Sequence, residues 1–514
     1  MKNKENPKKL SVFWAQKFRT RREISVFAKP CKISKRSLKG AKSRCFGGCE
    51  FRNLNYSNFS KVKIGLEVHV PLNTKSKLFC SCQAVPEKPN TNVCEICLGM
   101  PGSKPCLNKK ALEIAIGLAI ALKSNLSKTI LFVRKTYFYP DLPKKYQITQ
   151  YENPVAVNGK LKILNKIIPL TRIQLEEDPG SIYHKEDRAL IDFNRSGVPL
   201  IEIVTEPKFE NAKEVLDFLQ RLSSILDYLE IYNSKDFSIR TDINISTIGE
   251  KVEIKNVSGS KNIEKAINFE TIRQNLLSQR GEKIEQRTMH FDKETEKTFP
   301  SRTKESEEDY GYILEPDLPI IELSKEEILR IKKSIPELPL EKIERFEKQY
   351  DLNSDEAYVI TIEKEIADLY ESLYDKVNSS FLKNWISVSL KKVLNYNNKK
   401  FSETKIEVSQ IEKLIKKVTS KELTPRSAEF VLRELVNTPS EISIILEKLN
   451  ISKTSNEELN SLIEKTIREN RKAVEDYKNG KEKSLHFLIG QIVKATNGKA
   501  DAKIVKELII ERIK

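Results

Sequence analysis

Four cysteines in one short stretch have the types and the spacing of a metal site. The stretch "LFCSCQAVPEKPNTNVCEICLGMPG" holds a C-x-C pair and a C-x-x-C pair on either side of a Pro/Asn-rich loop, namely Cys80, Cys82, Cys94 and Cys97. Two close thiolate pairs are typical of a tetrahedral zinc site. Because four thiolates leave no open coordination position, we predict a structural zinc that contributes on the order of 10 kcal/mol to local folding. The alternative is a group of ordinary buried cysteines.

A second group of residues combines acids with a histidine and with bases. The segments "TRIQLEEDPGSIYH" and "DFNRSGVPLIEIVTEP" hold Glu176, Glu177, Asp178, His184, Asp192, Arg195, Glu202 and Glu206. Clustered carboxylates suit a hard cation such as Mg²⁺, and we expect phosphate contacts from Arg195, Arg240 and Lys255. A cation site combined with basic residues is typical of phosphoryl transfer. The sequence has no Walker A or kinase-type Gly-rich loop, so a nucleotide must bind by another arrangement.

Alternating segments predict strands that carry these residues. In "VKIGLEVHV" the apolar residues alternate with Glu67 and His69, which therefore point to one face, away from the core. The segments "LIEIVTEP", "RTDINIS" and "KVEIKNV" do the same for Glu202, Asp242 and Lys255. With helical segments between them, these strands predict an α+β region with a polar concave sheet. Each acid taken singly fits a solvated surface charge, but the shared face favours function for the set.

Two further segments combine basic residues with features suited to RNA. "VRKTYFYPDLPKKYQITQY" interleaves aromatics with bases, and we take Tyr137, Tyr139 and Lys144 as candidates for stacking on bases and holding phosphates. "HFLIGQIVKATNGKADAK" near the end of the chain offers Lys494 and Lys499 beside glycines that let an RNA backbone approach. The alternatives are core aromatics in a Pro-fixed loop and ordinary helix packing with a glycine C-cap.

The second half of the chain has a 3.6-residue apolar period almost throughout. Ser324 and Glu327 form a capping box that opens the first helix, and Pro425 after Thr424 marks another helix start. A boundary is expected before "NISKTSNEEL". The predicted organisation is a basic, disordered extension, a catalytic domain with a zinc knuckle, a helical domain and a helical tail, over residues 1–60, 61–323, 324–448 and 449–514.

Composition agrees with a soluble globular protein whose charge is unevenly distributed. The chain has 514 residues and a net charge of +18, but residues 1–48 carry +13 of it, so whole-chain charge is weak support for a nucleic-acid partner. We predict that the three cysteines in residues 1–60, Cys31, Cys45 and Cys49, are incidental. We find no membrane span, secretory signal or disulfide framework and expect a cytoplasmic protein. The alternative is an organelle matrix, because residues 1–60 also resemble a transit peptide.

These segments together resemble one family, the B subunit of the tRNA-dependent aspartyl/glutamyl amidotransferase (GatB). The resemblance covers essentially residues 61–514 in the expected order. It is carried by "IGLEVHV", "NTKSKLFCSC…PNTNVCEICLGMPG", "RKTYFYPDLPKKYQITQY", "LEEDPGS", "DFNRSGVPLIEIVTEP", "VEIKNVSG", "SRTKESEEDYGYILEPDLP" and "AVEDYKNGKEKSLHFLIGQIVKATNGKAD". These motifs are long and specific.

The resemblance implies both a fold and an activity. The fold would be a cradle-like mixed-sheet catalytic domain, an all-α helical domain and a tail related to the YqeY family, which would bind tRNA. The activity would be ATP-dependent phosphorylation of the side-chain carboxylate of Glu-tRNA(Gln) or Asp-tRNA(Asn), after which ammonia displaces phosphate. The implied partners are an amidase A subunit, which makes ammonia from glutamine, and a small C subunit. The implied cofactors are ATP, Mg²⁺ and structural zinc.

The resemblance also implies roles for particular residues. Glu67, His69, Glu202 and either Glu176 or Glu177 would bind Mg²⁺ and position the phosphoryl group. Asp242 would be a further catalytic member, and the cysteines would form the family's zinc knuckle. Two departures from the family pattern bear on this assignment: "DFS" precedes the arginine of "RTDIN", which puts the role of Arg240 in doubt, and "YGYILEPD" lacks a basic residue near Tyr310.

Three other interpretations remain open from the sequence. A related type of protein that works with an asparaginase-like partner carries a large inserted domain, whereas here "EPDLP" runs directly into helices. A non-catalytic, zinc-containing tRNA-binding scaffold would not require the acids and the histidine on one face. A zinc-dependent RNA-binding module without enzyme activity is disfavoured by the long acidic face, because bare carboxylates repel phosphate.

Overall fold

The computed structural model describes eight stretches of the chain. They are residues 61–85, 88–164, 166–232, 238–303, 311–438, 440–449, 456–496 and 502–513. The cysteines of the first sixty residues, Cys31, Cys45 and Cys49, lie outside them, as does the whole predicted extension. No helix within the described stretches is both long and apolar enough to cross a bilayer.

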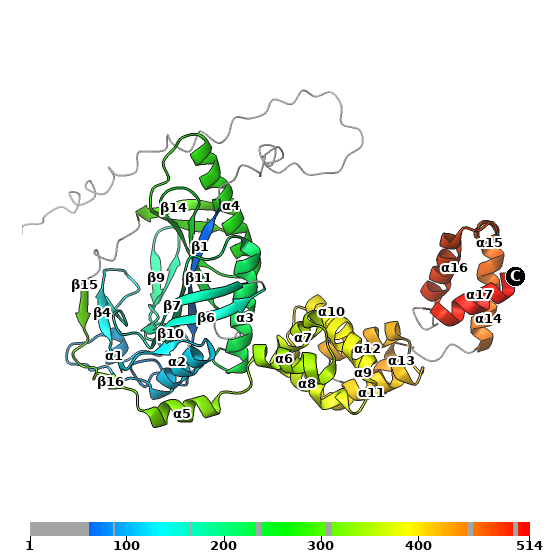
Figure 1. The fold of residues 1–514 in the computed structure, drawn as a ribbon, viewed down its shortest axis with the longest axis horizontal. Helices are drawn as coiled ribbons and strands as arrows, with labels where there is room; N and C mark the ends of the chain where they lie inside the picture. The colour runs from blue at the N-terminus through cyan, green and yellow to red at the C-terminus, as the bar shows by residue number, and fades with distance from the viewer. Residues whose placement is uncertain are drawn as a thin grey trace, which may run out of the picture. The chain divides into compact units, whose positions relative to one another are not determined.

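A nine-stranded mixed sheet forms the centre of the first part (Figure 1). Neighbouring strands are antiparallel, except that β12 and β13 run parallel. The order across the sheet is β14 (Lys297–Thr303), β13 (Arg287–Asp292), β12 (Val252–Val257), β11 (Arg240–Ser246), β1 (Lys63–Pro71), β10 (Pro199–Thr205), β7 (Lys166–Glu177), β6 (Ala156–Ile163) and β2 (Asn125–Leu126).

One face of this sheet is apolar and is covered by three helices. In β1 the apolar residues alternate with Glu67 and His69, and Ile64, Leu66 and Val68 are buried. They join a core with residues of the helices α2 (Lys109–Ala121), α3 (Ala212–Tyr228) and α4 (Ser260–Gln279). Because side chains alternate along a strand, burial of this face fixes Glu67 and His69 on the other one.

Smaller elements surround the sheet. Strands β15 (Gly311–Leu314), β4 (Val133–Thr136) and β5 (Tyr146–Thr149) form a three-stranded sheet. Strand β16 (Ile321–Glu322) pairs with β3 (Thr129–Ile130), and β8 (Ser181–His184) forms a hairpin with β9 (Ala189–Asp192). Two further helices are α1 (Glu95–Leu98) and α5 (Lys325–Ser334). Helix α5 begins at the predicted capping box, since the Ser324 hydroxyl accepts from the Glu327 N–H at 3.1 Å and the Glu327 carboxylate accepts from the Ser324 N–H at 3.3 Å.

The remaining described residues are helical and form two further hydrophobic cores. The Thr424 hydroxyl caps α12 as predicted. The first core is built from α6 (Pro339–Tyr350), α7 (Ser354–Thr361), α8 (Lys364–Tyr374), α9 (Ser379–Asn384), a π-helical turn (Trp385–Leu390), α10 (Lys391–Tyr396), a 3₁₀ turn (Phe401–Glu403), α11 (Val408–Thr419), α12 (Pro425–Asn437) and α13 (Ile442–Lys448). The second core is built from α14 (Asn456–Glu469), α15 (Arg471–Lys478), α16 (Glu482–Ala495) and α17 (Ala502–Ile513). The α+β fold class, with a mixed sheet followed by helices, is therefore confirmed.

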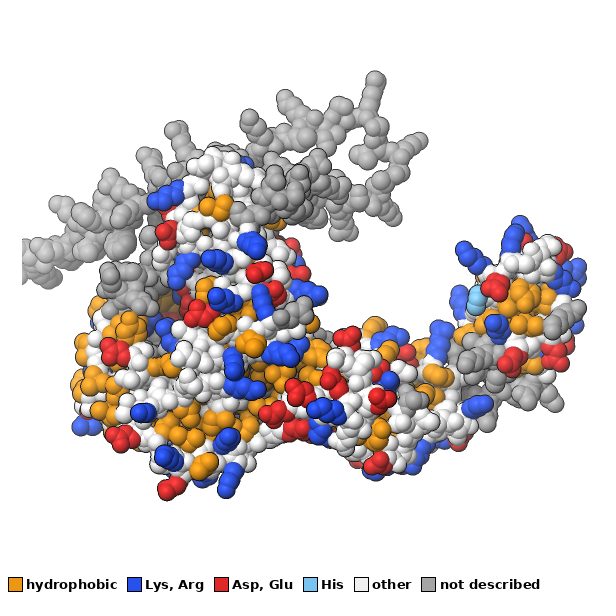
Figure 2. Space-filling model, in the orientation of Figure 1, with side chains coloured by type: hydrophobic (Ala, Val, Ile, Leu, Met, Phe, Trp, Pro, Cys, Tyr) orange, Lys and Arg blue, Asp and Glu red, His pale blue; other side chains and the backbone are white. Residues whose placement is uncertain are grey.

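Charge on the visible surface is mixed in sign. In Figure 2, lysine and arginine side chains alternate with acids over the described part rather than forming one block. This agrees with the small net charge that remains once the first 48 residues are set aside.

The central position of β1 gives a stability prediction. Leu66 is 1% exposed in the core beneath the sheet, so Leu66→Ala should lower the free energy of unfolding of the sheet-containing region by about 3 kcal/mol. Ile167 of β7 is 56% exposed, so Ile167→Ala should change it by no more than about 0.5 kcal/mol. Urea unfolding followed by circular dichroism measures both. Equal losses for the two variants would contradict this packing.

Candidate active site and cysteine cluster

Strand register places the predicted acids and His69 on one face of the sheet. Glu67 pairs with Asp242 of β11, while His69 pairs with Glu202 of β10 on one side and with Arg240 on the other. Residues directly opposite one another in an antiparallel pair point to the same face. The four residues that alternation assigned to a common polar face, Glu67, His69, Glu202 and Asp242, therefore lie together there.

His69 forms a compact cluster with two carboxylates. Its Nε2 atom lies 3.6 Å from Oε1 of Glu176 and 3.9 Å from Oε2 of Glu202. The Gln174 amide donates to Glu202 at 2.9 Å, and its own Oε1 atom is buried with no hydrogen-bond partner among the described residues. One imidazole nitrogen and two carboxylate oxygens within 4.8 Å of one another fit a hard divalent cation.

Burial and mutual repulsion shift the pKa values in this His69 cluster. Burial, and then the charge of Glu202, raise the pKa of Glu176 to about 7, although His69 opposes the shift. Burial alone would lower the pKa of His69, but the charges of Glu176 and Glu202 outweigh it and raise that pKa. Without a cation the cluster therefore retains protons near neutrality, and a divalent cation must displace them.

A second carboxylate cluster lies on the same face around Glu67. Oxygens of Glu67, Asp242 and Glu253 approach within 4.8 Å of one another. The Lys255 ammonium lies 3.2 Å from Asp242 and 3.3 Å from Glu253, and the Asn244 amide donates to Glu67 at 2.9 Å. Burial, followed by the neighbouring acids, raises the pKa of Glu67. Burial would lower the pKa of Lys255, but Asp242 and Glu253 outweigh it and raise that pKa, so this lysine stays charged.

The two predicted phosphate-binding arginines both contact Asp178. Arg240 donates to the buried Asp178 carboxylate at 2.8 Å. Arg195 lies 3.6 Å from the same carboxylate and donates to the carbonyls of Pro179 at 2.9 Å and Gly180 at 2.5 Å. Arg240 is therefore held beside His69 by a carboxylate, whereas Arg195 is engaged chiefly by the backbone.

Glu176 and Glu177, adjacent at the end of β7, contact different partners. Its carboxylate accepts from the Ile148 N–H at 2.9 Å and pairs with Lys144. Of the two alternatives in "LEEDPGS", Glu176 is thus the one that lies with His69. Lys144 is enclosed by this pair, with a side chain only 5% exposed, and does not present its ammonium to solvent.

The other candidate RNA-contacting residues differ in their exposure. Tyr137 is half-buried and lies near Gln147, with 3.3 Å between its hydroxyl and the amide oxygen, while the neighbouring Phe138 and Tyr139 are 77% and 52% exposed. Lys494 is exposed in the last turn of α16. Lys499 lies outside the described residues.

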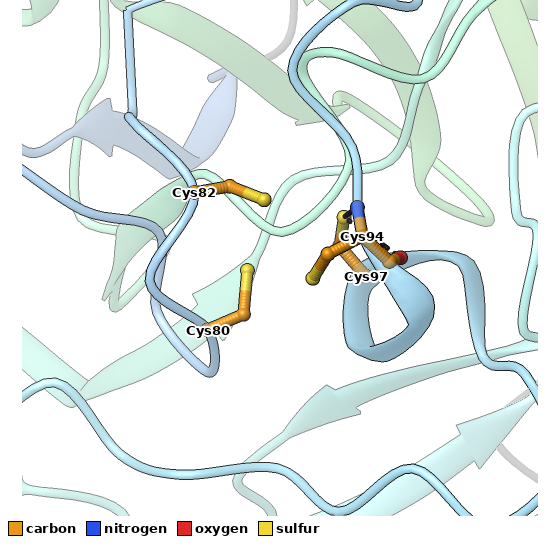
Figure 3. A group of neighbouring side chains, drawn as sticks. All are labelled: Cys80, Cys82, Cys94 and Cys97. Carbon is orange, nitrogen blue, oxygen red and sulfur yellow. Dashed lines mark hydrogen bonds between the residues drawn. The ribbon is translucent and has the colours of Figure 1, made fainter.

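The four cysteines come from two separate segments and face one another (Figure 3). Cys80 and Cys82 belong to one loop, whereas Cys94 and Cys97 flank the start of α1, where the Cys94 N–H donates to the Cys97 sulfur at 3.1 Å. All four sulfurs lie within 4.8 Å of one another, and the five cysteines in the described part of the chain form no disulfide. A tetrahedral zinc with Zn–S distances of about 2.3 Å fits this arrangement.

A buried lysine adds a charge argument for metal-bound thiolates. The fully buried Lys77 donates to the Asn92 carbonyl at 2.9 Å and to the Cys97 sulfur at 3.6 Å. A hydrogen bond from Cys80 lowers the pKa of Cys97 to about 5 and raises the pKa of Cys80 above its ordinary range. Four thiolates around a divalent ion leave a net charge of about −2, which a buried ammonium partly offsets.

Sequence reasoning assigned no role to three members of the polar face. Glu253 shares the outward side of "KVEIKNV" with Lys255, so alternation places it on the polar face. Gln174 lies two residues before Glu176 on β7, so the same alternation could have found it. Asn244 stands two residues after Asp242 and is found in the same way. Polar but uncharged side chains carry a weaker chemical signal than acids do.

The cysteine cluster predicts stoichiometric metal. The purified chain should contain about one zinc, and Cys97→Ser should remove it, because three thiolates and a hydroxyl bind zinc far less tightly. Cys106 is exposed and outside the cluster, so Cys106→Ser should retain the metal. Elemental analysis by mass spectrometry reads out both. Zinc lost equally from both variants, or retained in both, would contradict the assignment.

The raised pKa of Glu176 predicts how stability varies with pH. Its carboxyl takes up a proton near pH 7 in the folded chain, against an ordinary value of 4.5, so between these values the folded state binds more protons than the unfolded state. In magnesium-free buffer, the melting temperature of the catalytic region should therefore rise as the pH falls from 8 to 5. Glu176→Gln should flatten this dependence, and the exposed Glu186→Gln should not, in scanning calorimetry. A melting temperature that falls over this range would refute the prediction.

Two family models match most of the chain. Residues 62–329 match the family described as the GatB/GatE catalytic domain, and residues 368–513 match the family described as the GatB domain. The first match contains the cysteines, both carboxylate clusters and the whole nine-stranded sheet.

Curated relatives align over nearly their whole length. The chain is 40% identical to the B subunit of the aspartyl/glutamyl-tRNA(Asn/Gln) amidotransferase of Thermoanaerobacter pseudethanolicus, over 88% of this chain and 98% of the relative. It is 40% identical to the protein of the same name from Methanosarcina barkeri, over 89% and 99%, and 38% identical to that of Clostridium tetani, over 88% and 98%. The chain belongs to the GatB family, the B subunits of aspartyl/glutamyl-tRNA(Asn/Gln) amidotransferases.

Proposed function

We propose that the chain catalyses the ATP-dependent amidation of Glu-tRNA(Gln), Asp-tRNA(Asn) or both. The relatives carry the name of this activity. The observation that carries the proposal is the pair of carboxylate clusters, around His69 and around Glu67, with Lys255 and Arg240 on the same sheet face. A carboxylate and ATP are both anionic, so a site that joins them needs fixed positive charge and a place for a divalent cation.

The reaction proceeds in two steps. An oxygen of the substrate's side-chain carboxylate attacks the γ-phosphorus of ATP, and the bond to ADP breaks, which gives an acyl phosphate. Ammonia then attacks the acyl carbon, phosphate leaves with the bonding electrons and ammonia loses a proton, so the amide forms. Phosphorylation is needed because a free carboxylate is a poor electrophile.

Particular residues would serve these steps. His69, Glu176 and Glu202 would hold Mg²⁺, with Gln174 fixing the Glu202 carboxylate. When bound, the cation supplies charge neutralisation at the phosphate oxygens. Lys255 and Arg240 supply fixed positive charge for the attacking and transferred anions, and Asp242 and Glu253, followed by Glu67, keep Lys255 charged. The zinc at the cysteines has no open ligand position and so takes no part in the chemistry.

Partners and domain roles complete the proposal. The family consists of B subunits, which implies at least one further component; an amidase A subunit would supply ammonia from glutamine, and a small C subunit would complete a heterotrimer. We assign catalysis to residues 61–323 and tRNA binding to the helical tail, residues 449–514, with residues 324–448 between them. The exposure of Tyr139 and of Lys494 supports contacts with tRNA. The compartment is the cytoplasm or, if residues 1–60 act as a transit peptide, an organelle matrix.

The His69 cluster predicts which variant loses activity. With ATP, Mg²⁺, Glu-tRNA(Gln) and ammonium chloride, the chain should form Gln-tRNA(Gln), and His69→Ala should reduce the rate at least about 100-fold because a cation ligand is lost. His184, in the same acidic stretch of sequence, is exposed at the end of β8, so His184→Ala should retain the rate. Separation of the aminoacyl-adenosines after nuclease digestion measures the product.

The assay also discriminates between catalysis and scaffolding. No product from the wild-type chain, with the amidase partner present and tRNA binding intact, would overturn the catalytic proposal in favour of a tRNA-binding scaffold. If the His69→Ala variant forms product as fast as the wild type, the chain has the activity, but its active site does not lie on this sheet face.

A further inference from the structure

The loop of residues 192–198, between β9 and β10, is bound on one side by the segment that carries the second cysteine pair. The buried Asn194 accepts from the Asn92 N–H at 2.8 Å through Oδ1 and donates to the Lys88 carbonyl. Asn90 adds three contacts: its N–H donates to Asp192 at 2.9 Å, its amide donates to the Ile191 carbonyl at 2.9 Å, and its Oδ1 accepts from the Phe193 N–H at 2.7 Å. Two asparagines thus join residues 88–92 to this loop.

The same loop also packs directly on the metal-binding residues. The Ser196 hydroxyl donates to the Cys97 carbonyl at 3.3 Å, and the Leu78 N–H donates to the Gly197 carbonyl at 2.8 Å. Gly197 has a φ of +88°, and a Cβ there would lie 3.4 Å from the Lys77 side chain and 3.5 Å from that of Cys97. A larger residue would therefore be strained by the backbone conformation, while its Cβ would only contact Lys77 and Cys97 at ordinary distances.

On its other side the loop holds the polar sheet face. The Gly197 N–H donates to the Asp178 carbonyl at 2.9 Å, and the Asp178 N–H donates to the Val198 carbonyl at 2.8 Å. The Asp178 carboxylate binds Arg240, which pairs with His69 in the register of β1 and β11. The loop also leads straight into β10, the strand that carries Glu202.

The cysteine segment has few other means of staying ordered. Residues 88–91 and Glu95 are exposed, and in residues 88–97 only Cys97 is buried. A segment with so little apolar burial depends on its metal ligands for a fixed conformation. Loss of the metal would therefore remove the partners of Asn194 and Ser196 together.

We propose that the zinc knuckle, which comprises Cys80, Cys82 and residues 88–97, positions the catalytic face by fixing the loop of residues 192–198, with Asn194 as the principal positioning residue. The knuckle acts through both ends of the loop: Asn194 binds the knuckle, and the loop backbone leads from it to Gly197 and Val198, which bind Asp178, the partner of Arg240. The catalytic consequence rests on the proposed function, whereas the ordering of the loop does not.

Hydrogen exchange of the full-length chain tests the ordering. In the wild type, removal of zinc by a chelator should increase amide exchange in residues 192–198 by about tenfold or more. In Asn194→Ala the loop should exchange fast with zinc present, while the zinc content and the protection of β11 and β12 stay unchanged. Asn125→Ala, an exposed asparagine at the edge of the same sheet, is the control and should behave as wild type. If neither zinc removal nor Asn194→Ala changes the rate of amide exchange in residues 192–198, the proposal is overturned.

Kinetics of the zinc-loaded variants test the consequence for catalysis. Asn194→Ala should lower kcat about tenfold and leave KM for Glu-tRNA(Gln) within about twofold, because the loop positions reacting groups rather than the tRNA. Asn194→Asp keeps the acceptor for the Asn92 N–H and should recover part of kcat. If Asn194→Ala increases amide exchange in residues 192–198 but leaves kcat unchanged, the loop has no role in catalysis. If the wild type itself makes no product, the proposed function fails, and the exchange experiment still decides whether zinc orders the loop.

Discussion

Mutual repulsion among buried carboxylates is the constraint on which the rest of this structure depends. The two clusters on the polar face place acids within 4.8 Å of one another in a setting that is largely closed to solvent. Burial, followed by the charge of the neighbouring acids, raises the pKa values of Glu67 and Glu176. Such a face is stable only if fixed cations offset it, and Lys255 and Arg240 do so from the neighbouring strands.

The fold meets this constraint by holding the acids on β1 and on the strands that neighbour it in the sheet. The apolar side of β1 is buried under α2, α3 and α4, so its polar side cannot rotate away. The arginine beside His69 is held by Asp178, and Asp178 is bonded in turn to the loop that packs on the cysteines. The cysteine cluster and the polar sheet face are thus joined through this one loop.

Local pattern was sufficient to predict much of this arrangement. Alternation placed Glu67 and His69 on the polar side of β1, and the cysteine spacing identified the cluster. It could not decide between Glu176 and Glu177, because that choice depends on where β7 ends and on the pairing of Glu177 with Lys144. Local pattern also could not group Glu253 with Glu67, because these residues meet only through the pairing of β1, β11 and β12. The register of β11 and β12 shifts beside Asp242. Non-local register and long-range ion pairs are the information that a single sequence lacks.

The central claim is that this sheet face activates a carboxylate by transferring a phosphoryl group to it. The most direct measurement uses Glu-tRNA(Gln) labelled with ¹⁸O in the side-chain carboxylate, incubated with the chain, ATP, Mg²⁺ and ammonium. If an acyl phosphate forms, the inorganic phosphate released with the amide carries one ¹⁸O atom from the carboxylate, and mass spectrometry detects it. Phosphate free of ¹⁸O, released together with labelled Gln-tRNA(Gln), would contradict the account.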